Sequence, residues 1–414
     1  MSKRNENRPG YRKTEVGWIP EGWEILPFSE CCNIGQGQVD PTDSKYQNLP
    51  HIGPENIESN SGRILGVKTA IELGLISGKY LFDRRAIVYS KIRPNLNKLC
   101  APWFEGLCSA DCYPLWPKNE NLKEYIFQFM LSPQFLKQSI PVSLRTGMPK
   151  INREDLSLLR VTLPPIPEQK KIAEILSTWD EAIDQTRKLI EAKKRRKKAL
   201  MQQLLTGKRR LPGFSGKWRA CSFKDYFKRI VRKNTKSCEN ALTISGPLGL
   251  INQEHYFKKR IAAQDLTSYY LIKKGEFAYN KSYCKGYPLG AIKMLDRYNE
   301  GVVSTLYICF RSKEGDGVHR EFMKYYFESG VFNKELYSIA QEGARNHGLL
   351  NVNAQDFFAT KLLLPLKDEQ IAITDLLTTV GKEIKTLEQK LAALEKQKRG
   401  LMQKLLTGEV RVRI

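Results

Sequence analysis

Five short stretches of the sequence concentrate amide, basic, hydroxyl and aromatic side chains among Gly, Pro and Asn residues that favour loops and turns. Arg and Lys can hydrogen-bond to guanine, and Asn and Gln can pair with adenine, whereas contacts to phosphate position a protein without reading sequence. Such stretches could therefore bind and read DNA. The candidate DNA-contacting residues are Gln36, Gln38, Tyr89, Lys91, Arg93, Asn95, Asn97, Lys98, Arg145, Thr146, Lys150, Tyr279, Asn280, Lys281, Tyr283, Lys285, Arg345, Asn346 and His347.

Each candidate also has an ordinary structural interpretation. A polar side chain on a loop can simply be solvated, and tyrosines in β-rich segments, such as Tyr89 and Tyr279, often pack in a core. The stretches at 89–98 and 145–150 have counterparts at matching places in the second half of the chain. This recurrence favours a shared role for them.

The charge of the chain indicates a polyanionic partner. The 414 residues contain 68 Lys and Arg against 44 Asp and Glu, which gives a formal net charge of +24. Neutralising phosphates releases condensed counterions, so a basic excess of this size favours binding to nucleic acid. Charge alone does not separate ribosomal, RNA-binding and DNA-binding proteins.

The sequence lacks the motifs of the enzymes that act on DNA. It contains no N-P-P-Y or D-P-P-Y of amino-methyltransferases, no phosphate-binding G-x-x-x-x-G-K-[ST] loop, and no P-D…E-x-K nuclease pattern. The nine cysteines and four histidines show no spacing typical of a metal site. We therefore expect a non-enzymatic chain with no catalytic residue, no metal and no cofactor of its own.

The sequence shows no membrane-spanning segment and no signal peptide, which bears on the location of the protein. No segment approaches the ~18 consecutive apolar residues of a membrane span, and no apolar stretch follows the N-terminal charges. We expect a cytoplasmic protein without a membrane partner.

The chain is an internal repeat. The segment at 163–176, LPPIPEQKKIAEIL, matches LPLKDEQIAITDLL at 364–377, and LMQQLLTG at 200–207 matches LMQKLLTG at 401–408. The offset is 201 residues at both ends, and 18 of the 49 positions from Leu163 to Leu211 are identical. Upstream, Asn152 and Asp155 fall on Asn353 and Asp356 at the same offset. Each half is thus a variable region of roughly 140 residues followed by a well-matched segment.

The matched segments predict two long helices, from about 168 to 206 and from about 369 to 407. Their apolar residues recur at alternating steps of three and four, which is a coiled-coil heptad pattern. Since each apolar seam must be buried, we expect the two helices to pair antiparallel. The residues expected to pack the helices are Leu176, Trp179, Ile183, Leu200, Leu204, Leu377, Val380, Ile384, Leu387, Leu391, Leu394, Leu401 and Leu405.

Lysines interrupt this seam. Lys193 and Lys197 take seam positions in the first helix and Lys398 does so in the second. A charge at such a position costs stability but fixes register. The basic run at 193–198 is either a solvated helix end or a contact with phosphate or an acidic partner subunit.

The variable halves show short β-rich pieces separated by Gly, Pro and Asn turns, with helices near 122–131 and 319–328. We therefore predict an α+β protein with an internal two-fold repeat. It has two similar globular domains separated by two long antiparallel coiled-coil helices.

The two helix segments, the sequences with proline and E-Q at their starts (PPIPEQ at 164–169 and PLKDEQ at 365–370) and the N-terminal GWIPEGWEIL at 17–26 together resemble the specificity subunits of type I restriction–modification systems. The resemblance covers essentially the whole chain, although 365–370 reads P-L-K-D-E-Q instead of the double-proline form of the first half. It implies a repeat-containing, DNA-binding subunit whose two target-recognition domains each read one half of a split, asymmetric site. The implied segments are an N-terminal segment 1–22, target-recognition domains 23–165 and 209–366, a central spacer helix 166–208 and a C-terminal spacer helix 367–414.

The same resemblance implies partners. Two modification subunits carrying S-adenosylmethionine would methylate adenine at N6, and restriction subunits using ATP and Mg would translocate and cleave DNA. Three alternatives stay open on the sequence: a coiled-coil adaptor that binds only protein, an RNA-binding protein, and an enzyme with a divergent site.

Overall fold

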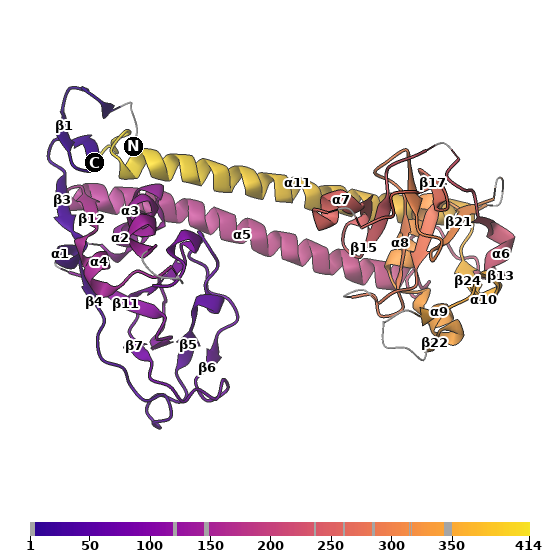
Figure 1. The fold of residues 1–414 in the computed structure, drawn as a ribbon, viewed down its shortest axis with the longest axis horizontal. Coiled ribbons are helices and arrows are strands. Elements are labelled where there is room, and N and C mark those ends of the chain that lie inside the picture. The colour runs from indigo at the N-terminus through magenta and orange to yellow at the C-terminus, as the bar shows by residue number, and fades with distance from the viewer. Residues whose placement is uncertain are drawn as a thin grey trace. The chain divides into compact units, whose positions relative to one another are not determined.

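The computed structural model describes residues 5–118, 122–144, 149–235, 237–259, 261–283, 286–313, 315, 317–342 and 350–414. The chain divides into two compact units: unit 1 comprises Met1–Arg187 and Gln389–Ile414, and unit 2 comprises Lys188–Glu388. Two long helices, α5 (Ile166–Leu204) and α11 (Lys367–Leu406), contribute to both units (Figure 1). The five-segment division by target-recognition domain and spacer helix is a different partition and stays a prediction.

Unit 1 contains two four-stranded sheets with the orders β4-β11-β8-β9 and β6-β5-β10-β7, a β3-β12 pair and an N-terminal β1-β2 hairpin. Its strands are β1 (Tyr11–Thr14), β2 (Gly17–Pro20), β3 (Glu24–Pro27), β4 (Cys32–Ile34), β5 (Pro50–Ile52), β6 (Lys68–Thr69), β7 (Tyr80–Phe82), β8 (Ile87–Ser90), β9 (Leu99–Cys100), β10 (Gly106–Cys108), β11 (Cys112–Pro117) and β12 (Arg160–Leu163). Its helices, besides part of α5 and α11, are α1 (Phe28–Cys31), α2 (Lys123–Leu131), α3 (Pro133–Ser143) and α4 (Arg153–Leu158), with 3-10 turns η2 (Pro54–Asn56) and η3 (Pro94–Leu96).

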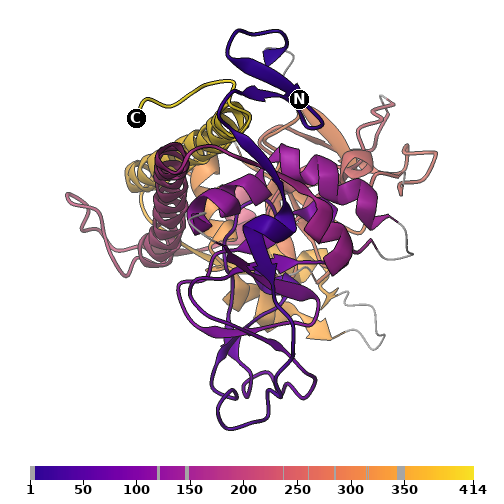
Figure 2. The ribbon, with the colours of Figure 1, turned by 90° about the vertical axis from the view of Figure 1, so that its left-hand side faces the viewer.

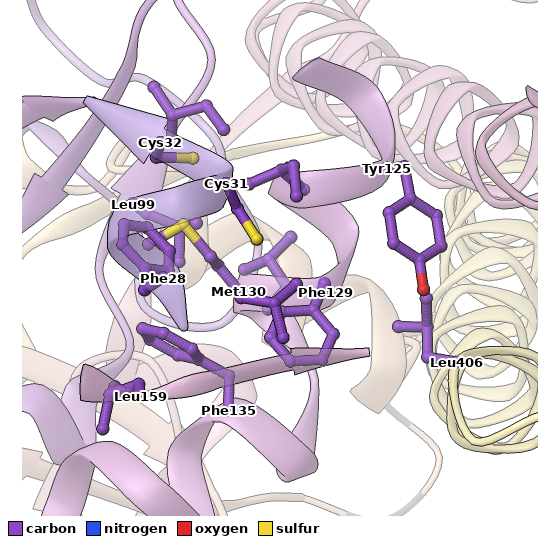
Figure 3. Close-up of a cluster of buried hydrophobic side chains, with 14 of the residues drawn as sticks. Phe28, Cys31, Cys32, Leu99, Tyr125, Phe129, Met130, Phe135, Leu159 and Leu406 are labelled. Carbon is purple, nitrogen blue, oxygen red and sulfur yellow. The ribbon is translucent and has the colours of Figure 1, made fainter. Parts of the chain in front are cut away.

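The core of unit 1 joins the sheet β4-β11-β8-β9 to helices α2 and α3. Phe129 and Phe135 lie in edge contact at 6.2 Å between ring centroids, and the buried Tyr125 donates a hydrogen bond to the Thr162 carbonyl oxygen at 2.7 Å. Figure 3 shows Leu406, from the end of α11, next to Tyr125. Burial of Leu406 in this cluster fixes the end of α11 on the globular part of unit 1.

Unit 2 contains a four-stranded sheet with the order β14-β21-β18-β19 and four two-stranded pairs, β13-β24, β15-β16, β17-β20 and β22-β23. Its strands are β13 (Arg219–Ser222), β14 (Phe227–Ile230), β15 (Leu242–Ser245), β16 (Gly249–Asn252), β17 (Tyr270–Lys273), β18 (Phe277–Asn280), β19 (Ala291–Met294), β20 (Glu300–Val303), β21 (Ile308–Ser312), β22 (Gln341–Glu342), β23 (Leu350–Asn351) and β24 (Lys361–Leu364). Its shorter helices are α6 (Phe223–Tyr226), α7 (Gln253–Phe257), α8 (Arg320–Glu328), α9 (Asn333–Ile339) and α10 (Ala354–Ala359).

The two units repeat one topology. The sheet β4-β11-β8-β9 of unit 1 corresponds to β14-β21-β18-β19 of unit 2, and the β3-β12 pair corresponds to β13-β24. Asn152 caps α4 by accepting from Asp155 N at 2.7 Å, and Asn353 caps α10 by accepting from Asp356 N at 2.8 Å. The α+β class and the internal repeat are thus confirmed.

Helices α5 and α11 pack antiparallel within each unit. In unit 1, Arg187 of α5 binds Glu395 of α11 at 2.5 Å, and in unit 2, Lys193 binds Glu383 at 2.7 Å. Figure 2 shows the two helices side by side. Buried residues of the expected seam are Leu176, Ile183, Leu204, Leu377, Val380, Ile384 and Leu405, and half-buried ones are Trp179, Leu200, Leu387, Leu391, Leu394 and Leu401.

Each lysine of the seam has a specific neighbour. Lys398 is buried and binds Asp180 at 2.6 Å in unit 1. Lys197 lies in unit 2 with its Nζ 5.3 Å from the centre of the Tyr325 ring, and burial lowers its pKa. Since these contacts are specific, the lysines favour one register of the two helices.

Each long helix ends in the same way. Gly207 and Gly408 have positive φ angles of 70° and 66°, which residues other than glycine adopt at a cost. Arg209 N donates to the Gln203 carbonyl, and Val410 N donates to the Lys404 carbonyl. Together with the hydrogen bonds from Gly207 N to the Leu204 carbonyl and from Gly408 N to the Leu405 carbonyl, they satisfy backbone carbonyls at the end of each helix. The left-handed glycine that this ending requires explains why LLTG recurs in the sequence.

An arginine that follows each helix binds the glutamate at the start of the other helix; we name these pairs the Arg–Glu clasps. In unit 1, Arg411 donates to both carboxylate oxygens of Glu168, at 2.6 and 2.8 Å, and Trp23 Nε1 donates to the same carboxylate at 3.0 Å. In unit 2, Arg210 binds both oxygens of Glu369. Both glutamates are buried, so the clasps are the main compensation for their charge.

The neighbouring glutamines also act alike. Gln169 Nε2 donates to the Pro164 carbonyl and Gln370 Nε2 to the Pro365 carbonyl, each at 3.0 Å. The Oε1 atom of Gln370 accepts from His319 N, at the start of α8. The E-Q pair therefore connects the start of each long helix to the adjoining globular part.

The cysteines of unit 1 are buried free thiols: Cys31, Cys32, Cys100, Cys108 and Cys112. Burial raises the pKa of Cys31 and of Cys100 to about 12. In the part of the chain that the structure describes, no helix is both long and apolar enough to cross a membrane.

Candidate nucleic-acid interface

Two stretches that the sequence marks separately lie side by side in unit 1. Arg93 N donates to the Pro149 carbonyl at 2.7 Å, and Ile151 N donates to the Lys91 carbonyl at 2.9 Å. Ile92 and Lys150 form an antiparallel bridge. The exposed side chains of Arg93 and Lys150 therefore come from neighbouring backbone segments. We name this surface, with Lys91 and Asn95, the paired loop of unit 1.

Backbone geometry supports a specific role for the paired loop. Arg93 and Asn97 flank the turn η3 with φ angles of 48° and 45°, a left-handed conformation that is uncommon outside glycine. Strain of this kind persists where the surroundings enforce it and is frequent at functional sites. Arg93 and Asn95 are exposed, whereas Asn97 is buried and donates to the Leu131 carbonyl at 3.2 Å. Asn97 is thus corrected from a DNA-contacting residue to one that holds the turn.

Arg153 connects the paired loop to a second candidate loop, and sequence reasoning missed it. Its Nη2 donates to the Gly35 carbonyl at 2.9 Å and to the Tyr80 hydroxyl at 2.7 Å. Its guanidinium lies 4.6 Å from the centre of the Tyr113 ring, and Lys91 Nζ lies 5.1 Å from the same ring. Arg153 therefore ties the loop that carries the exposed Gln36 and Gln38 to the paired loop.

The two candidate tyrosines are buried, which corrects their assignment. Tyr89 makes an edge contact with Phe135 at 5.8 Å, and Tyr279 stacks on Phe357 at 5.3 Å and donates to the Leu289 carbonyl. Burial raises the pKa of both phenols. Neither side chain reaches the surface, because both strands β8 and β18 direct it into the core.

Lys98 has a partner within the domain. Its Nζ donates to the Pro54 carbonyl at 2.6 Å and the side chain is half-buried. By contrast, no ion-pair partner of Arg93 or Lys150 is found within the described residues. Their charges are accordingly available to an anion.

Unit 2 presents a related arrangement. The Lys281 carbonyl oxygen accepts a hydrogen bond from Leu350 N at 3.0 Å, and Lys281 Nζ donates one to the Val352 carbonyl at 3.2 Å. Burial lowers the pKa of Lys281. Asn280 is half-buried and its Oδ1 accepts from Ser282 N at 3.1 Å, while Tyr283 is 63% exposed. The segment after β18 is thus held against β23, as residues 91–93 are held against 149–151 in unit 1.

Six candidates lie outside the described residues: Arg145, Thr146, Lys285, Arg345, Asn346 and His347. Across the residues that are described, no group of three or more His, Cys, Asp or Glu side chains is placed to hold a metal ion.

Known proteins similar to this chain share one description. Residues 20–194 match the family model of the type I restriction modification DNA specificity domain. The specificity subunit of the type I restriction enzyme EcoDI from Escherichia coli is 38% identical over 162 residues, which cover 39% of this chain and 36% of that protein. The MjaVIII specificity subunit from Methanocaldococcus jannaschii is 26% identical over 442 residues, which cover 95% of this chain and 94% of that protein.

Solved structures agree on the fold. The HsdS subunit from Thermoanaerobacter tengcongensis superposes with a TM-score of 0.50 at 19% identity, covering 95% of this chain and 98% of that one. A chain from a study of complex assembly and conformational transition of the type I R-M system gives a TM-score of 0.59 at 17% identity, covering 95% and 99%.

Proposed function

Since the chain belongs to the family of type I restriction–modification DNA specificity subunits, we propose that it reads a bipartite, asymmetric site in double-stranded DNA, one half with each unit. The observation that carries this proposal is the paired loop of unit 1 and its counterpart after β18 in unit 2. Two domains of one topology with different side chains at the same place suit two different half-sites.

Within unit 1, we assign phosphate binding to Arg93 and Lys150, whose charges are exposed. Base reading is assigned to the exposed amides of Gln36, Gln38 and Asn95, since amides pair with adenine edges. Arg153 acts as a positioning residue through Gly35 and Tyr80.

The proposed chain is a non-catalytic subunit of a cytoplasmic complex. Two modification subunits would hold S-adenosylmethionine and methylate adenine at N6, and restriction subunits would use ATP and Mg to translocate and cleave. The basic surface of this chain supplies DNA affinity, and the helices α5 and α11 supply a surface for the modification subunits.

The decisive experiment is methylome sequencing of a host that carries this chain and its partner subunits, compared with a host that lacks this chain alone. We expect a split N6-methyladenine motif that disappears with the deletion. Loss of methylation in only one half of a motif, or persistence of the whole motif, would contradict the proposal.

Arg93→Ala is expected to weaken DNA binding similarly at all sequences and to lower the salt slope by about one unit, because one phosphate contact is lost. The measurement is DNA affinity against salt concentration for the complex with modification subunits. Arg85→Ala is a matched control, since the Arg85 side chain is 81% exposed and pairs with Asp83 in the same unit. Equal salt slopes for Arg93→Ala and the wild type would remove Arg93 from the interface.

A further inference from the structure

One arginine of unit 1 joins both long helices to the globular part. Arg187 of α5 donates from Nη2 to Glu395 of α11 at 2.5 Å, and from Nη1 to Glu58 at 2.6 Å. Glu58 begins a turn at residues 58–63, which we name the 58–63 turn. The side chains of Arg187, Glu395 and Glu58 are 21%, 30% and 34% exposed, so all three charges are partly withdrawn from water. Arginine suits this place because its rigid fork of donors can hold two carboxylates in fixed directions.

A second arginine adds to this group of charges. Glu58 N donates to the Arg63 carbonyl at 3.0 Å, which closes the 58–63 turn. The Arg63 side chain forms ion pairs with Glu58 at 3.6 Å and with Asp184 of α5 at 3.7 Å. Three carboxylates thus share two guanidinium groups. Without Arg187 the carboxylates would be in excess, and their repulsion would push the turn away from the helices.

The 58–63 turn also holds the backbone of the paired loop. Asn60 N donates to the Asn97 carbonyl at 3.1 Å. Asn97 directly follows the turn η3, which carries the exposed side chain of Asn95. A continuous series of contacts therefore runs from α11 through Arg187 and the 58–63 turn to the paired loop.

Unit 2 has the helix–helix part of this arrangement without the turn. At the offset of 201 residues, Arg187 corresponds to Glu388 and Glu395 corresponds to Lys194, so the two charges are exchanged. Glu388 and Lys194 pair at 2.9 Å, and both side chains are nearly half exposed. Within the described residues of unit 2, neither forms an ion pair with a residue outside the two long helices. The connection to a loop is therefore a property of unit 1 and not of the repeat.

We propose that Arg187 is a positioning residue, which fixes the paired loop for base reading by holding the 58–63 turn against α5 and α11. This inference rests on the proposed function of the paired loop and adds to it a residue that acts without touching DNA. In the absence of Arg187, the turn and the loop that it holds would adopt several positions. Base reading would then lose discrimination, because the reading side chains are no longer ordered before DNA binds.

The test measures the affinity of the complex with modification subunits for DNA that carries the intact site, and for DNA with one base pair substituted in either half-site. Exchange of residues 23–163 identifies the half-site of unit 1. We expect Arg187→Gln to lower discrimination at that half-site about tenfold, roughly the value of one base contact, and to leave discrimination at the other half-site unchanged. Glu388→Gln is the matched control, since it removes the equivalent helix–helix pair, and it should discriminate at both half-sites as the wild type does.

Glu58→Gln tests whether the effect passes through the 58–63 turn. It should lower discrimination at the unit 1 half-site as Arg187→Gln does, and the double variant should lose no more than either single variant, because both break one connection. Additive losses would overturn the proposal. So would an equal loss of affinity of Arg187→Gln for all the DNA duplexes, or a lower unfolding temperature with unchanged discrimination, since its role would then be structural only. A wild type that discriminates at neither half-site would overturn the proposed function, and this inference with it.

Discussion

Arg411→Leu is expected to lower the free energy of unfolding of unit 1 by about 3 kcal/mol, because it leaves the buried Glu168 carboxylate with only Trp23 as a polar side-chain partner. The hydrogen bonds to Glu168 raise the pKa of the Arg411 guanidinium, which reflects the same coupling. Removing one partner of a buried ion pair lowers stability over a range of values, and we take the lower end of that range because the Arg411 side chain is 43% exposed. Hydrogen exchange resolved by peptide measures the effect at the start of α5 and the end of α11.

The repeat provides the matched control. Arg210→Leu removes the equivalent Arg–Glu clasp of unit 2. It should raise the rate of amide hydrogen exchange at the start of α11 and after α5, and leave the exchange rates in unit 1 unchanged. Adding Glu168→Gln to Arg411→Leu should restore most of the lost stability, since the buried charge is then gone. If Arg411→Leu left exchange in unit 1 unaltered, the clasp would be only a surface contact.

Replacing residues 23–163 with the matching segment of another specificity subunit is expected to change one half of the methylated motif completely and to leave the other half intact. This segment contains the paired loop and the loop with Gln36 and Gln38, which we assign to one half-site. Methylome sequencing of the chimera reads both halves at once.

The reciprocal chimera exchanges residues 218–364, which correspond to 23–163 in the repeat. It should change the opposite half of the motif. A change in both halves from either chimera would contradict the assignment of one half-site to each unit.

The long helices and the repeat were predictable because their signals are local and periodic. The heptad spacing and the shared LLTG ending lie within single segments, and the structure places α5 and α11 close to the expected limits. The sheet orders were not predictable, because strands of two to six residues carry little periodicity and β10 pairs with β5 across more than fifty residues.

The candidate interface was predicted in part. Residues 91–93 and 149–151 share a surface because a backbone bridge at Ile92 and Lys150 joins them, which spacing in the sequence cannot reveal. Tyr89 was wrongly assigned to the DNA interface. Strand β8, which leads into the paired loop, also directs side chains into the core, and Tyr89 is one of them. Arg153 was missed because its repeat counterpart is Ala354, so comparison of the two halves gives no signal there.

The buried thiols of unit 1 have a practical consequence for chemical labelling. Thiolate is the nucleophile toward maleimides, and burial raises the thiol pKa values while it blocks reagent access. All five native cysteines of unit 1 should therefore react slowly in the folded protein. A single cysteine introduced at the exposed Asn48 would then carry a fluorophore selectively within unit 1, and no native cysteine there would need replacement.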